Sequence, residues 1–186
     1  MGRANKLLAD LGGKPMVRQV VEAALASRAR PVLVVTGHEA ASVVAALVGL
    51  QVTFVDNPDY AVGLSSSLKA GIGAVPAGCD GALVLLGDMP QITGALIDRL
   101  IAAFAASPGD AIIVPTHKGR RGNPVLWSRA HFAEMLQLEG DAGAKRLMAI
   151  HAGDVREVDL GTDAIFADVD TPEALEELRG GQTPRA

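Results

Sequence analysis

Residues 82–90 read ALVLLGDMP: an aliphatic run is followed by a glycine, a carboxylate and a proline. Continuous aliphatic runs are typical of strands that are buried on both faces, as in a parallel sheet. Ligands of open parallel sheets bind beyond the carboxyl ends of the strands. The stretch therefore predicts an α/β fold in which Asp88 stands at the ligand-binding edge.

Further apolar runs and helical patterns alternate on both sides of this stretch. We expect strands at residues 32–36, 52–56, 82–87, 111–115 and 166–170. Helices are expected at residues 14–27, 39–47, 65–75, 94–106, 128–136, 141–150 and 172–178. This alternation predicts a doubly wound α/β sandwich with a mostly parallel central sheet. It is expected to form a single domain, residues 1–180, followed by a flexible tail, 181–186, with residues 116–126 as a loop or hairpin near the site.

Composition narrows the class of protein. Hydrophobic residues make up 49% of the 186 residues and aromatic residues 3%, so the core must be aliphatic. The formal net charge of −4 argues against a nucleic-acid partner, because phosphate backbones require a basic face. Cys79 is the only cysteine, which excludes an internal disulfide and favours a cytoplasmic location. No apolar run is long enough to span a membrane, so no membrane partner is expected.

Two acidic segments are candidate metal ligands. Mg²⁺ prefers oxygen ligands, typically one or two carboxylates together with substrate phosphates, and Asp88 fits that role. In the segment DVDTP at 168–172, strand alternation would place Asp168 and Asp170 on the same side. The alternative is that these side chains only cap the helices that follow them. One of Asp170 and Thr171 can cap while the other points into the cleft.

Other polar residues suit a phosphorylated substrate. Lys6 precedes the first helix and could neutralise a triphosphate, although a solvated surface lysine is the alternative. Gly63, Ser65 and Ser66 lie at a helix amino terminus, where capping and phosphate contact are compatible. The basic turn RRGNP at 120–124 is either a solvated loop or a rim that receives an anionic second substrate. The four histidines have no metal-ligand spacing and are expected to be structural or at the surface.

Taken in order, these segments resemble the molybdenum-cofactor nucleotidyltransferases, and the closest branch is the molybdenum-cofactor cytidylyltransferases. The likeness rests on NKLL at 5–8, LGGKP at 11–15, NP at 57–58, GLSSSL at 63–68, GDMP at 87–90, RGNP at 121–124, GDAGA at 140–144 and DVDTP at 168–172. It implies a Rossmann-like nucleotidyltransferase sandwich. It also implies Mg²⁺-dependent transfer of CMP from CTP to the molybdenum cofactor, with release of pyrophosphate.

The resemblance also assigns roles to residues. Asp88 and Asp170 match the metal-binding aspartates, and with Lys6 they form the expected catalytic set. Gly63, Ser65 and Ser66 join Lys6 and Asp88 as expected nucleotide-binding residues. The expected acceptor-binding residues are Arg121, Gly122 and Asn123, where Asn123 stands at a position that is commonly histidine. A molybdopterin-type acceptor and a molybdoenzyme or its chaperone are the implied partners.

The front of the chain departs from the family pattern. Family members carry a first strand and a glycine-rich loop that ends in Arg-Met-Gly, of which Met1 and Gly2 correspond to the last two residues. We therefore expect the first strand to be missing, as it would be if the chain begins at an internal methionine of a longer protein. Two alternatives stay open: transfer of another base or to another acceptor, such as guanylyl transfer or a sugar-phosphate acceptor, and a non-catalytic nucleotide-binding remnant.

Overall fold

The computed structural model describes residues 5–139 and 143–181. Residues 1–4, 140–142 and 182–186 lie outside the described residues. They include Met1 and Gly2, the first two residues of the helix expected at 141–150, and residues 182–186 of the predicted tail. Gly181, which the sequence places in the tail, is the last residue of a helix. The helices and 3-10 turns (η) are η1 Lys6–Leu8, α1 Met16–Ala26, α2 Ala40–Ala46, η2 Tyr60–Val62, α3 Leu64–Gly73, α4 Gly94–Ala105, η3 Arg129–His131, α5 Phe132–Met135, α6 Gly143–Ile150, η4 Asp163–Phe166 and α7 Pro172–Gly181.

Among the described residues the strands form three sheets and confirm the predicted α/β class. The expectation of a mostly parallel central sheet is wrong, because the five-stranded sheet is mixed and most of its pairs are antiparallel. The strands are β1 Asp10–Leu11, β2 Lys14–Pro15, β3 Leu33–Thr36, β4 Thr53–Asp56, β5 Gly81–Val84, β6 Ile112–His117, β7 Arg120–Arg121, β8 Val125–Ser128 and β9 Val155–Asp159. Strands β3 and β4 pair in parallel, as do β6 and β9. Strand β8 lies antiparallel between β5 and β6, while β7 folds back on β6 as the hairpin expected within residues 116–126.

Three local predictions are wrong. Residues 166–170 do not form a strand: Phe166 ends η4, and residues 167–170 have no regular secondary structure. The predicted helix at residues 128–136 is shorter, because Ser128 ends β8 and only η3 and α5 follow. Strands β1, β2, β8 and β9 were missed, and Lys14–Pro15 form β2 instead of opening the helix expected at 14–27. Strand β9 carries exposed charged residues and a weak apolar pattern, with Val155 and Val158 half-buried.

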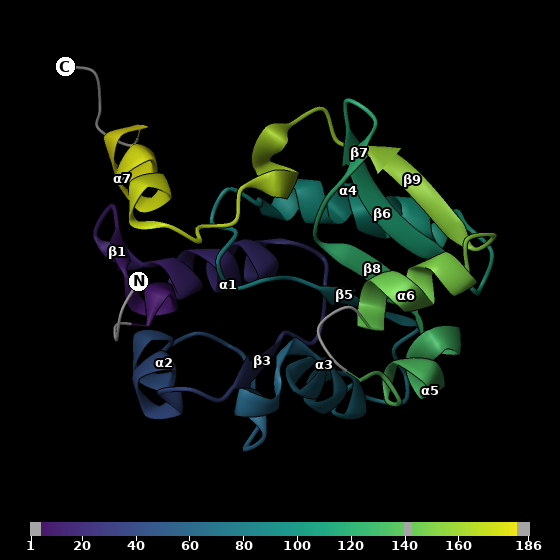
Figure 1. Cartoon of the computed structure of the whole chain (residues 1–186), viewed down its shortest axis with the longest axis horizontal. Helices are drawn as coiled ribbons and strands as arrows, with labels where there is room; N and C mark the ends of the chain where they lie inside the picture. Colours follow the sequence, from purple (N-terminus) through teal and green to yellow (C-terminus); the bar gives the residue numbers. More distant parts are fainter. Residues whose placement is uncertain (1–4, 140–142, 182–186) are drawn as a thin grey trace.

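Helices cover both faces of the five-stranded sheet (Figure 1). Strand β6 alternates between two cores: Ile113 joins the core under α4, whereas Ile112 and Val114 join the core shared with α5 and α6. Leu100 of α4 and Trp127 of β8 are likewise fully buried on these two faces. Helix α4 begins at the predicted cap, since the side chain of Thr93 accepts a hydrogen bond from the Leu96 amide.

The β3–β4 pair and α2 form the other half of the molecule, with α1 between the halves (Figure 1). Val34, Val43 and Leu47 make a separate small core with Val17 and Val21 of α1. Strand β4 is mostly exposed and β5 is half-buried, because each is hydrogen-bonded on one side only within residues 5–139 and 143–181. In that part of the chain, no helix is long and apolar enough to cross a membrane.

Candidate active site

Asp88 lies in the loop that follows β5, and its neighbours in the sequence hold that loop in place. Met89 is 1% exposed and belongs to the core under α4. Gly87 allows close packing, because a Cβ there would lie 3.3 Å from the side chain of Leu7. A buried anchor on one side and a small residue on the other therefore fix the carboxylate beside the amino-terminal segment.

Asp170 does not lie on a strand, and a backbone hydrogen bond of its neighbour Val169 holds it near Asp88. The amide of Val169 donates a hydrogen bond to the carbonyl oxygen of Asp88, at 3.0 Å. Val169 is buried with Leu11, Met16 and Leu175, which ties this segment to the start of the chain. The side chain of Thr171 accepts from the amide of Ala174 and so caps α7, which leaves the side chain of Asp170 free of that task.

Lys6 lies between the two carboxylates. Its Nζ is 2.6 Å from Oδ2 of Asp88 and 2.5 Å from Oδ1 of Asp170. Turn η1 presents the lysine, and the side chain of Asn5 caps that turn by accepting from the amide of Leu7. The structure thus brings together the three residues that the sequence named as the catalytic set.

The contact between Lys6 and Asp170 shifts the pKa of both groups. Burial alone would lower the pKa of Lys6, but the hydrogen bonds to Asp170 and Asp88 outweigh it, so the pKa lies above its usual value. The hydrogen bond from Lys6 holds the pKa of the Asp170 carboxyl below its usual value. At neutral pH Lys6 is therefore an ammonium and Asp170 a carboxylate.

The donor set fits a hard divalent cation. Asp88 and Asp170 offer carboxylate oxygens to one shared position, which Lys6 Nζ occupies in the structure. Oδ1 of Asp88 is buried and, among the described residues, has no hydrogen-bond partner. A buried carboxylate oxygen without a partner is unfavourable, and an ion bound there would satisfy it.

The expected nucleotide-binding segment opens α3. Gly63 is the residue before the helix and has φ of 127°, a conformation that favours glycine. The predicted serine caps do not form: the hydroxyl of Ser66 donates to the Gly63 carbonyl, and no side chain caps α3. Ser65 is buried.

Asn57, at the end of β4, organises this segment, and its role was missed in the sequence. It is 3% exposed and donates hydrogen bonds to the hydroxyls of Ser66 and Ser67, at 2.9 and 3.0 Å. Its Oδ1 accepts from the amide of Asp59. A buried amide directly after an expected strand was the signal that could have identified it.

Two loops connect this segment to Lys6. The side chain of Asn5 contacts the carbonyl oxygen of His38 at 3.5 Å, and the His38 ring lies 5.9 Å from the ring of Tyr60. Gly37 must be small, because a Cβ there would lie 2.5 Å from Cβ of Tyr60. The end of β3, turn η2 and the start of α3 therefore form one continuous edge with η1.

The expected acceptor residues lie at the end of the β7 hairpin and just after it. This segment contacts η4, and the chain runs from η4 to Asp170. Arg121 is exposed and pairs with Glu157 of β9 at 2.7 Å. The amide of Asn123 donates to the carbonyl oxygen of Ile165 at 3.0 Å. Gly122 fits tightly against Ile165, since a Cβ there would lie 2.8 Å from its Cγ1. Four residues after Ile165, Val169 makes the backbone contact with Asp88.

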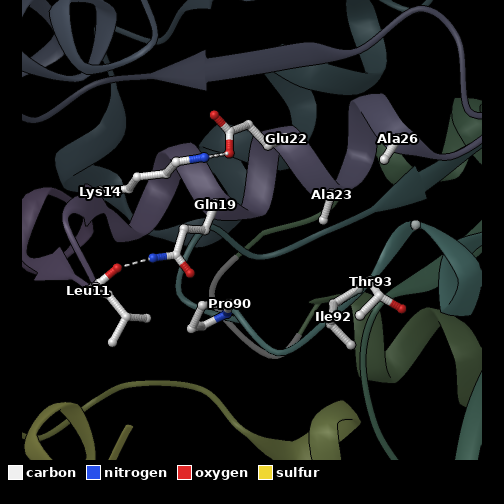
Figure 2. Close-up of a pocket in the computed structure, with 11 residues that line it drawn as sticks. Leu11, Lys14, Gln19, Glu22, Ala23, Ala26, Pro90, Ile92 and Thr93 are labelled. Atoms are coloured by element: carbon white, nitrogen blue, oxygen red, sulfur yellow. Dashed lines mark hydrogen bonds and ion pairs between the residues drawn. The ribbon is translucent and has the colours of Figure 1, made fainter. Parts of the chain in front are cut away.

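A cavity of about 520 Å³ lies next to the Asp88 loop, between α1 and the start of α4 (Figure 2). Pro90, Ile92 and Thr93 line one wall. On the α1 side, Lys14 pairs with Glu22, and Gln19 donates to the carbonyl oxygen of Leu11 (Figure 2). The lining contains none of Lys6, Asp88 and Asp170, so the cavity is a neighbour of the catalytic set and not part of it.

Solved structures share this fold closely. Rv0371c from Mycobacterium tuberculosis H37Rv superposes with a TM-score of 0.82 at 24% identity, covering 96% of this chain and 90% of that one. The same protein was also solved in complex with manganese, with a TM-score of 0.80, 26% identity and coverage of 94% and 91%. A nucleotidyl transferase from Methanothermobacter (Mth528) gives 0.81 at 26% identity, with coverage of 96% and 85%. These likenesses establish the Rossmann-like nucleotidyltransferase fold.

The sequence then places the chain more narrowly. The family model "MobA-like NTP transferase domain" matches residues 1–157, so the chain belongs to the MobA-like NTP transferase family. The molybdenum cofactor cytidylyltransferase of Escherichia coli is 32% identical over 66% of this chain and 59% of that protein. The purine catabolism protein PucB of Bacillus subtilis is 31% identical over 94% of this chain and 88% of that protein.

A third relative has another acceptor in its name. The 3-deoxy-manno-octulosonate cytidylyltransferase of Bdellovibrio bacteriovorus is 38% identical over 55% of this chain and 40% of that protein. The chain therefore spans 59% of the length of the E. coli relative and 40% of the length of the Bdellovibrio relative. Two of these relatives are named as cytidylyltransferases, and their names differ in the acceptor.

Proposed function

We propose that this protein is a Mg²⁺-dependent cytidylyltransferase that transfers CMP from CTP to a molybdopterin-type acceptor and releases pyrophosphate. One observation carries the proposal: Asp88 and Asp170, 82 residues apart in the chain, meet at the Nζ of Lys6. Two carboxylates and one ammonium at a single point are the groups needed to handle a magnesium triphosphate. Membership of the MobA-like NTP transferase family supports the same class of reaction.

The reaction needs no nucleophile from the protein. A phosphate oxygen of the acceptor attacks the α-phosphorus of CTP in line, and the bond to the β-phosphate oxygen breaks as pyrophosphate leaves. Mg²⁺ held by Asp88 and Asp170 would supply positive charge to the phosphate oxygens. Lys6 adds a second, fixed positive charge at the same place, where the transition state accumulates negative charge.

The rest of the edge has a role in binding. We assign the nucleotide to the segment from Gly63 to Ser66 at the amino terminus of α3, because the dipole of a helix start favours anionic groups. The β7 hairpin supplies Arg121, which can bind an anionic acceptor as an exposed guanidinium. We assign the molybdopterin-type acceptor to this hairpin, with a molybdoenzyme or its chaperone as the onward partner, in the cytoplasm.

Two relatives support the alternative that the protein is a nucleotidyltransferase with another base or another acceptor. The likeness to 3-deoxy-manno-octulosonate cytidylyltransferase keeps CTP as donor but changes the acceptor to a sugar acid. The likeness to PucB extends over nearly the whole chain, beyond the span matched by the E. coli enzyme. Donor and acceptor must therefore be tested separately.

The donor is tested by calorimetry. Binding of CTP, GTP, ATP and UTP to the full chain is measured with and without Mg²⁺. We expect CTP to bind most tightly, and only with Mg²⁺ present. Preference for GTP would replace cytidylyl by guanylyl transfer. No binding of any nucleotide would favour the non-catalytic remnant.

The catalytic role of the carboxylates is tested with Asp88→Ala, assayed as pyrophosphate release with a molybdopterin-type acceptor. Loss of a strong electrostatic stabiliser lowers turnover by about a hundredfold or more. Asp98→Ala, at a carboxylate on α4 that contacts Arg28, is the matched control. Turnover of Asp88→Ala near that of the wild type would refute the assignment.

A further inference from the structure

A second cluster of metal-ligating side chains lies far from Lys6 and Asp88. It joins His131 of η3, Glu134 of α5, His151 just after α6 and Asp154 just before β9. Helices α5 and α6 lie together at one end of the molecule, whereas β1 and α7 lie at the opposite end (Figure 1). These histidines have no metal-ligand spacing in the sequence, because the residues come from separate elements.

The geometry of the cluster is compact. Nδ1 of His151 is 3.4 Å from Oδ2 of Asp154, and Nε2 of His131 is 3.9 Å from the same oxygen. One ligand atom from each of these three residues lies within 4.8 Å of the other two. In a tetrahedral zinc site with metal–ligand bonds of about 2.0–2.1 Å, ligand atoms are roughly 3.3 Å apart. Only small side-chain shifts separate the cluster from that arrangement.

The surrounding contacts favour the same reading. Nε2 of His151 contacts both carboxylate oxygens of Glu134 at 3.0 Å, which turns Nδ1 towards Asp154. Metal-bound histidines usually have their second ring nitrogen held by such a carboxylate. Nε2 of His131 lies 2.7 Å from the carbonyl oxygen of Asp110, and this is the hydrogen bond that an ion would replace.

Burial leaves the cluster open on one side. The side chain of His131 is 3% exposed, whereas those of His151 and Asp154 are 23% and 28% exposed. A buried ligand with two partly exposed ones gives an ion both a fixed anchor and a path of entry. Two imidazoles and one carboxylate suit Zn²⁺ and its transition-metal neighbours, whereas Mg²⁺ takes oxygen ligands.

We propose that His131, His151 and Asp154 bind a Zn²⁺-type ion, with Glu134 orienting His151. The ion would join η3 and α5 to the turn between α6 and β9. The site is separate from the carboxylates of the proposed nucleotidyl transfer and does not depend on it.

The test uses the full chain, stripped of metal with a chelator and titrated with Zn²⁺ by calorimetry in excess Mg²⁺. We expect one Zn²⁺ per chain and a thermal stabilisation by Zn²⁺. His151→Ala should weaken the affinity by about a hundredfold and Glu134→Gln by roughly 10- to 100-fold, as for a residue behind a ligand. Co²⁺ in place of Zn²⁺ should give the strong visible absorption of a tetrahedral site in the wild type but not in His151→Ala.

Two controls decide where the ion binds. His38→Ala removes a histidine outside the cluster and should leave the affinity unchanged. The double variant Asp88→Asn, Asp170→Asn removes the catalytic carboxylates and should still bind one Zn²⁺. The proposal is overturned if the wild type binds no Zn²⁺, if His151→Ala binds it equally well, or if the double variant loses it.

Discussion

Contacts of individual residues explain why the carboxylates of Asp88 and Asp170, which are distant in sequence, lie together. The motif GDMP predicted Asp88 from the sequence, because a carboxylate after an aliphatic strand is easily recognised. Asp170 was predicted from the alternation of a strand, but no strand forms at residues 166–170. Its position depends on the backbone hydrogen bond from Val169 to Asp88 and on the burial of Val169, and neither contact leaves a trace in a sequence pattern. Asn57 shows the same limit, since its partners Ser66 and Ser67 belong to another element.

Gly122 gives a test at this scale. Gly122→Ala places a Cβ 2.8 Å from Cγ1 of Ile165, and it also meets the Ile165 carbonyl oxygen. Overpacking of this kind lowers the free energy of unfolding by about 1–3 kcal/mol. Urea unfolding measures the loss. Gly78→Ala, where a Cβ would meet nothing within 4 Å, is the control and should change stability little. Equal stability of the two variants would contradict the packing argument.

At the scale of elements, long patterns were predictable and short ones were not. Helices α1 and α4 lie within the expected ranges, because each carries an apolar stripe over three turns. Strand β9 was missed, because its exposed Arg156 and Glu157 conceal the pairing with β6. The expected strand at residues 166–170 failed for the opposite reason: its apolar residues are buried by packing around η4 and α7 instead of by a sheet.

Helix α1 carries a pH-dependent contact. Glu22 accepts hydrogen bonds from Lys14 at 2.7 Å and from Arg18 at 3.0 Å, and the bond from Lys14 is the main reason that its pKa is lowered. A lowered carboxyl pKa stabilises the fold above the usual pKa of 4.5, and the stabilisation is lost as the pH falls through the folded-state value.

Glu22→Gln should therefore lower the free energy of unfolding at neutral pH by about 0.5 kcal/mol, the usual size for a partly exposed ion pair. In strongly acidic solution the variant and the wild type should be equally stable. Urea midpoints measured at several pH values check both expectations, with Glu39→Gln as the exposed control. A difference that stays constant into strong acid would rule out the ion pairs as its source.

For the molecule as a whole, α7 closes the fold onto its own beginning. Leu175 is buried with Leu11, Met16 and Val169, so the last described helix packs against the first residues. Arg179 adds hydrogen bonds to the carbonyl oxygen of Asp10, at 3.0 and 2.9 Å. Both ends of the chain are therefore needed to bring Asp170 to Lys6. The sequence predicted the helix but not this packing, because the partners are more than 150 residues apart.

Leu175→Ala tests this closure. Removing a buried leucine side chain costs about 2–5 kcal/mol when the site cannot relax. We expect faster amide hydrogen exchange in α7 and in β1, measured by mass spectrometry, together with weaker Mg²⁺-nucleotide binding. Leu136→Ala, at a leucine that is 39% exposed, is the control. Unchanged exchange in β1 would show that α7 does not support the start of the chain.

The position of Lys6 has a consequence for the order of ligand binding. A tethered ammonium already pairs with both carboxylates, so a divalent ion arriving alone must compete with a charge that is always present at high local concentration. A triphosphate offers that ammonium a new anionic partner and carries the ion with it. Donor and ion should therefore enter as one complex, and the free protein should hold the ion only weakly.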